Sequence, residues 1–175
     1  MKIPEIKDFT EVIPPEDALD GFHAWKEFGG LDLAEAYTKF CSHPGYYQED
    51  LMFMGARAFL FYFPVIDRYI REIECPANRF DDEAWILACG LRIQFEKDAR
   101  TLAPIRDRAE QLCDFVSHGL SQLPEGATFR PIQEITDAWA EAKAAVTATT
   151  GNGDVPSEHP RGQGGKPQEG PSFRP

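Results

Sequence analysis

EDLMFMGARAFLFYFPVIDRYI, residues 49–70, holds a dense run of apolar and aromatic side chains. It is a candidate for a membrane span, a binding surface or the central helix of a core. A membrane-spanning helix needs about 20 apolar residues, whereas the apolar run over residues 51–66 is shorter and Arg57 interrupts it. Residues 58–63 have no polar face, which is typical of a helix surrounded by other elements. The stretch therefore predicts the central helix of an all-α core.

Pro64 lies in the middle of this helix. Proline has no amide hydrogen, and its ring crowds the carbonyl four residues earlier, which here belongs to Leu60. We therefore expect the helix to be kinked or divided at this point. After Pro64, Val65 begins an apolar stripe at helical spacing that runs on through Ile66, Tyr69, Ile70 and Ile73. The charged residues that we expect to cover the other face are Asp67, Arg68, Arg71, Glu72 and Glu74.

Five other segments carry apolar residues every three or four positions, the spacing of an amphipathic helix. They cover residues 16–28, 32–43, 78–100, 104–123 and 131–146, and Gly or Pro residues mark several of their ends. Asp32 stands three residues before Glu35, as in a capping box. The sequence thus predicts an all-α fold, a single compact bundle of about five to six helices with a kinked central helix.

The chain divides into a helical domain, residues 1–146, and a C-terminal tail, residues 147–175. The tail is rich in Gly and Pro and has only two large apolar residues, Val155 and Phe173. Such a segment buries too little surface to offset the entropy of ordering, so we expect it to be disordered. Its three acidic and three basic residues cancel, which leaves the formal net charge of -11 on the helical domain.

An acidic domain repels nucleic acid and anionic membranes and attracts basic partners. We therefore expect a basic protein partner, no nucleic acid and no membrane. The alternative interpretation of the negative charge is that it only keeps the protein soluble.

The first 20 residues have no apolar stretch behind a basic start, so they indicate neither a secretory signal nor a transit peptide. We expect a cytoplasmic protein. The cysteines stand far apart without the spacing of zinc ligands, and we expect them to be buried free thiols. They are Cys41, Cys75, Cys89 and Cys113.

Sequence motifs of catalysis are missing from the chain. It contains no Gly-x-Ser-x-Gly, phosphate loop, His-Glu-x-x-His or Gly-x-Gly-x-x-Gly, and its four histidines are isolated from one another. We therefore predict no catalytic residue, no metal and no cofactor, and the sequence indicates no enzyme class.

The best candidate for a binding site is HPGYYQEDLMFMGAR, residues 43–57. Adjacent tyrosines on a Pro-Gly loop beside two carboxylates are the mixture that interfaces favour. The predicted partner-binding residues are Tyr46, Tyr47, Glu49, Asp50 and Arg57.

A purely structural role for the same residues is the other interpretation. Asp50 would cap a helix that begins at Leu51, Glu49 would favour the positive end of that helix, and Arg57 would pair with a carboxylate there.

The pattern Glu-Asp-Leu-x-x-Met-Gly, followed by Ala-Phe and Tyr-x-Pro within residues 49–64, resembles a stretch found in small uncharacterised bacterial helical proteins. Some such short acidic proteins are thought to act as immunity or accessory partners of toxins. The resemblance implies no catalytic residue and no particular partner.

Two functions from different classes follow. The first is a non-enzymatic acidic binding protein, for instance an immunity-type or accessory partner of a basic protein. The alternative is a small helical enzyme or ligand-binding domain with a pocket near His43, Glu49, Asp50 and Arg57.

Overall fold

The computed structural model describes residues 1–11, 19–72 and 82–148. Within these ranges the chain forms eight α-helices, one 3-10 helix and no strand, which confirms the all-α prediction. The helices are α1 (Ile6–Phe9), α2 (Leu19–Phe28), α3 (Leu33–Ser42), α4 (Pro44–Phe53), α5 (Ala56–Glu72), α7 (Asp82–Asp98), η2 (Ala103–Ile105), α8 (Arg106–Ser121) and α9 (Ile132–Thr147). The predicted number of five to six is wrong, because α1 and α4 are additional helices.

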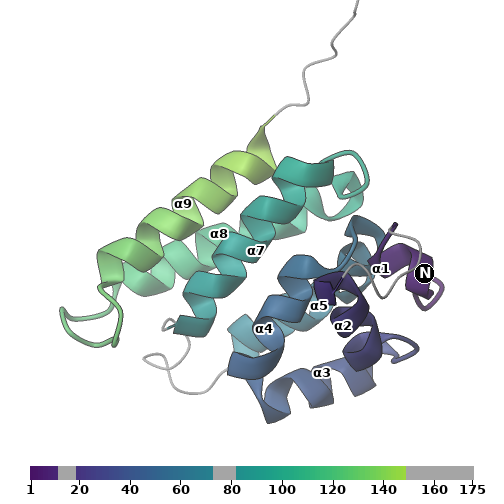
Figure 1. Ribbon diagram of the computed structural model, residues 1–175. Coiled ribbons are helices and arrows are strands. Elements are labelled where there is room, and N and C mark those ends of the chain that lie inside the picture. The colour runs from purple at the N-terminus through teal and green to yellow at the C-terminus, as the bar shows by residue number, and fades with distance from the viewer. Residues whose placement is uncertain (12–18, 73–81, 149–175) are drawn as a thin grey trace, which may run out of the picture.

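The helices form two groups that share one hydrophobic core (Figure 1). In the first group, α9 packs against α7 and α8; in the second, α4 packs against α2 and α3, and α5 packs against α3. The contact between α4 and α7 joins the two groups. None of the helices in the described ranges is both long and apolar enough to span a bilayer.

The N-terminus of α3 matches its prediction. Asp32 accepts hydrogen bonds from the backbone N–H groups of Ala34 and Glu35, and the Glu35 side chain accepts from the backbone N–H of Asp32. At the end of α2, Gly30 has a φ of 81°, a backbone conformation that favours glycine. The pair Gly29 and Gly30 therefore ends α2.

The central helix begins later than predicted. The chain leaves α4 at Met54 and starts α5 at Ala56, so the division falls at Gly55 and not at Pro64. A Cβ at Gly55 would lie 2.4 Å from the carbonyl oxygen of Asp8, and the Gly55 N–H donates to the Phe9 carbonyl at 2.8 Å. Only glycine permits this close approach of α1, which explains the break.

Pro64 does not divide α5, which is one continuous helix over its whole length, and the structure does not show the predicted kink. Ten of its 17 residues are buried, including Phe59, Tyr62 and Ile70. Tertiary packing of this extent supplies most of a helix's stability and tolerates the one hydrogen bond that proline removes. Asp67, expected on the charged face, is also buried.

Cysteine exposure differs from the prediction of uniformly buried thiols. Cys41 is exposed, Cys89 is half-buried and Cys113 is buried, while Cys75 lies outside the described residues. The predicted disordered tail, residues 147–175, also lies outside them from residue 149 onward, while Thr147 is the last residue of α9.

Thiol reactivity follows from this burial. Burial raises the pKa of the Cys113 thiol to about 12, so almost no reactive thiolate forms at pH 8 in the folded protein. We expect Cys41→Ser to remove a fast phase of reaction with Ellman's reagent, and Cys113→Ser to change only the thiol count after unfolding in urea. Fast native reaction of Cys113 would contradict its buried position.

Candidate functional site

The stretch around the two tyrosines forms a helix, where a loop was predicted. Pro44 occupies the first turn of α4, a position where its missing N–H and fixed φ are favourable. Tyr46 and Tyr47 follow in the same turn. Asp50 lies inside the helix, so the prediction that it caps a helix starting at Leu51 is wrong.

Helix α4 has one buried and one exposed side. Gln48, Asp50 and Leu51 are buried, whereas Tyr46, Glu49 and Phe53 are exposed. The exposed residues are three and four positions apart, which places them on one face of a helix.

A buried carboxylate lies between α4 and the neighbouring helix α2. The Asp50 side chain is 7% exposed, and its Oδ1 lies 2.7 Å from Nδ1 of His23, which comes from α2 and is about half exposed. Asp50 Oδ2 is buried without a hydrogen-bond partner among the residues that the structure describes. Burial raises the pKa of the Asp50 carboxyl, and the hydrogen bond with His23 opposes that shift.

His23 links this carboxylate to the surface. Its Nε2 lies 3.3 Å from the Tyr46 hydroxyl, and the Tyr46 ring packs edge-on against Tyr47 with ring centroids 4.9 Å apart. The contacts from Asp50 through His23 to Tyr46 therefore lead from the interior to the solvent. It fixes the orientation of an exposed aromatic ring.

Tyr47 is held by a second set of contacts. Its ring packs edge-on against Phe28 with centroids 5.7 Å apart, and Lys39 Nζ lies 5.2 Å from its centroid. Lys39 also forms an ion pair with Glu27 at 2.7 Å. Tyr47 therefore supports the position of Tyr46 from the half-buried side.

Helices α2 and α4 together expose a mixed apolar and acidic surface, which we call the α2–α4 face. Three large side chains on it are well exposed, Leu19 at 77%, Tyr46 at 60% and Phe53 at 43%. Two exposed carboxylates, Asp20 and Glu49, lie on the same two helices. The α2–α4 face consists of Leu19, Asp20, His23, Tyr46, Glu49 and Phe53.

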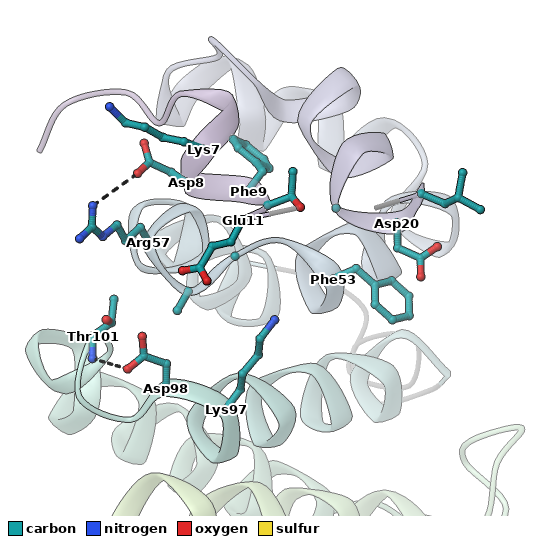
Figure 2. A pocket seen from close by; sticks show the side chains of 15 residues that line it. Lys7, Asp8, Phe9, Glu11, Asp20, Phe53, Arg57, Lys97, Asp98 and Thr101 are labelled. Atoms are coloured by element: carbon teal, nitrogen blue, oxygen red, sulfur yellow. Dashed lines mark hydrogen bonds and ion pairs between the residues drawn. The ribbon is translucent and has the colours of Figure 1, made fainter. Parts of the chain in front are cut away.

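Arg57 does not join the other predicted site residues. Its side chain is 76% exposed, and its Nη1 lies 3.9 Å from Asp8 Oδ1 on α1 (Figure 2). Both line a cavity of about 1070 Å³ between α1, α2, α4, α5 and α7, which Lys97 enters from α7. Leu19, Asp20 and Phe53 of the α2–α4 face line the same cavity. His43 lies elsewhere, at the junction of α3 and α4, with its Nδ1 3.3 Å from Ser42 Oγ.

Four of the six residues of the α2–α4 face were not predicted from the sequence, namely Leu19, Asp20, His23 and Phe53. The first three lie on another helix, and His23 is 27 positions from its partner Asp50. Phe53 carried a usable signal, because its spacing from Tyr46 and Glu49 is helical. Assignment of residues 44–47 to a loop concealed that spacing.

Three comparisons give no relative from which a role can be transferred. No protein-family model matches the chain, and no curated protein or solved structure is significantly similar to it. Among the described residues, no group of three or more His, Cys, Asp or Glu side chains is arranged to hold a metal ion.

Proposed function

We propose that the protein is a non-enzymatic acidic binding protein that binds a basic protein partner through the α2–α4 face. The observation that carries the proposal is the exposure of Leu19, Tyr46 and Phe53 beside the carboxylates of Asp20 and Glu49. Protein interfaces combine aromatic anchors with a polar surround. The charge of -11 favours a partner of opposite sign.

The predicted site residues have different roles in this proposal. Tyr46 and Glu49 contact the partner directly. Tyr47 positions Tyr46 through ring packing, and Asp50 positions it through the intervening His23. Arg57 is the weakest member, because its described ion pair is with Asp8 beside the large cavity.

An immunity-type or accessory role for a basic partner is the specific form of this function that we propose. It rests on the acidic charge and on the resemblance of residues 49–64. A cytoplasmic location belongs to the same proposal, since Cys41, Cys89 and Cys113 are free thiols, as is usual in a reducing compartment.

The enzyme or ligand-binding alternative required a pocket near His43, Glu49, Asp50 and Arg57. The large cavity includes Arg57 but none of the other three residues. His23 has the carboxylate-oriented geometry of a general base, yet it also does not line that cavity, and its Nε2 faces the Tyr46 hydroxyl. The binding function therefore has the better support.

Site-specific crosslinking tests the proposal. With a photoreactive phenylalanine analogue at Tyr46, we expect a covalent adduct with a basic protein in cells of the source organism, and no such adduct with the analogue at exposed Gln122, which directly follows α8. Adducts that are equal at both positions, or only with acidic proteins, would contradict the proposal.

Association kinetics with the captured protein then test the charges. Asp20→Asn with Glu49→Gln should slow association about 3- to 10-fold and change dissociation less, because carboxylates at an interface rim steer encounter. Raising salt from about 50 to about 300 mM should reduce the difference. Asp107→Asn with Glu125→Gln, the same two changes at exposed positions outside the α2–α4 face, is the matched control. Equal slowing by both pairs would show a general charge effect without a site.

A further inference from the structure

Three arginines lie around the C-terminal half of α5, and two of them pair with a buried carboxylate. Asp67 is 3% exposed, and its Oδ1 accepts a hydrogen bond from Arg71 Nε at 2.8 Å. Arg108, from α8, approaches the other oxygen with Nε at 2.7 Å and Nη2 at 2.6 Å. Asp67 thus binds two guanidinium groups from two helices.

The third arginine is held by a second carboxylate. Arg68 Nε donates to Glu72 Oε2 at 2.8 Å, and the Tyr37 hydroxyl of α3 donates to the same oxygen at 3.0 Å. The Arg68 guanidinium also stacks on the Tyr37 ring, with its carbon 3.9 Å from the ring centroid. These contacts fix the orientation of Arg68 although its side chain is 51% exposed.

The cluster holds more cationic groups than anionic ones. Three guanidinium groups face two carboxylates, an excess of one positive charge on a protein whose formal net charge is -11. Within the part of the chain that the structure describes, Arg68 and Arg71 donate hydrogen bonds through Nε, and no acceptor contacts their Nη groups. A guanidinium held by its Nε edge presents its outer donors in the fork that carboxylates and phosphates bind.

These arginines line a cavity of about 460 Å³, and a second cavity of about 470 Å³ adjoins it. Leu33, Ala34 and Pro64 line both cavities, so the two meet at these residues. The second is mostly apolar and includes Ile3 and Phe61. Each cavity has the size of a small-ligand pocket, and together they place an apolar hollow next to a cationic one.

We propose that this groove between α3, α5 and α8 binds a small amphipathic anion, a carboxylate or phosphate monoester with an unbranched apolar tail. Arg68, Arg71 and Arg108 bind the anionic group, and the tail lies along Leu33, Pro64 and Phe61. The site shares no residue with the α2–α4 face, so it does not depend on the proposed protein partner.

Calorimetric titration of the full chain tests the site with decanoate and octyl phosphate below their micelle concentrations. We expect saturable binding of at least one probe at one site per chain, at least tenfold tighter than decanol, acetate or inorganic phosphate. The tighter of the two probes identifies the headgroup. Decanol binding as tightly as decanoate, or no saturable binding of either anionic probe, would overturn the proposal.

Variants at both ends of the groove locate the binding. Arg68→Gln is expected to weaken binding of the preferred probe about tenfold, since a charge-assisted hydrogen bond is lost. Leu33→Gln should weaken it several-fold, because its side chain lies at the junction of the two cavities. Arg100→Gln, at an exposed position that lines neither cavity, is the matched control. Equal effects of Arg68→Gln and Arg100→Gln, with unchanged melting temperatures, would show that binding occurs elsewhere.

Discussion

Replacing Phe59 with Ala is expected to lower the free energy of unfolding by about 3–5 kcal/mol. Phe59 has no exposed surface, and it lies in the part of α5 that is apolar on every side. Its ring is 6.2 Å from that of Phe63, measured between centroids. Alanine would leave a cavity among close-packed side chains that relax only partly, which adds to the lost transfer free energy.

Urea unfolding followed by circular dichroism measures this change, and Phe53→Ala provides a matched control. The same atoms are removed there, but Phe53 is 43% exposed, so the expected loss is below about 1 kcal/mol. A loss below about 1 kcal/mol for Phe59→Ala as well would place Phe59 outside the core and restore the interpretation of residues 49–70 as a binding surface.

The sequence predicts most helices because each one buries a stripe of apolar side chains. On α7, the apolar stripe at helical spacing, Ala84, Leu87, Ala88, Leu91 and Phe95, is buried throughout. On α9, Ile135, Trp139, Ala142 and Val146 are buried, whereas Ile132, which begins the same predicted stripe, is half-buried. Periodicity of this kind is a local property, so it can be recognised without knowing what the helix packs against.

The division between α4 and α5 could not be predicted in the same way. Pro44 directly follows the predicted helix over residues 32–43 and begins α4, because proline is favourable at a first helical position. The end of α4 depends on Gly55, whose lack of a Cβ lets α1 approach. That contact joins segments more than 40 residues apart, from Asp8 and Phe9 to Gly55, and no local pattern reports it.

The burial of charged residues at the candidate sites also could not be predicted from local sequence. Asp67 stands among charged neighbours in the sequence, which predicts an exposed position, yet Arg71 and the distant Arg108 pair with it in the interior. Asp50 is similar, because His23 from α2 satisfies one of its oxygens. Burial of a carboxylate depends on a partner, and that partner is often remote in sequence.

The C-terminus of α4 depends on one side chain of α7. The last carbonyls of a helix have no partner within the helix and need one elsewhere when they are buried. Gln94, 1% exposed, supplies it, since its Nε2 donates to the carbonyls of Met52 at 2.8 Å and Met54 at 2.7 Å. The side chain thereby holds the end of α4, next to Phe53 of the α2–α4 face, against the second group of helices.

Gln94→Leu is therefore expected to lower the free energy of unfolding by about 2–4 kcal/mol, because two carbonyls lose their donor at about 1–3 kcal/mol each. Gln133→Leu on α9, whose described hydrogen bond is to exposed Asp137, should cost less than about 1 kcal/mol. Hydrogen exchange should also accelerate at the amides of Met54 and Gly55, and crosslinking from Tyr46 should weaken. Equal stability of the two variants would mean that water reaches the end of α4, so that Gln94 does not fix its position.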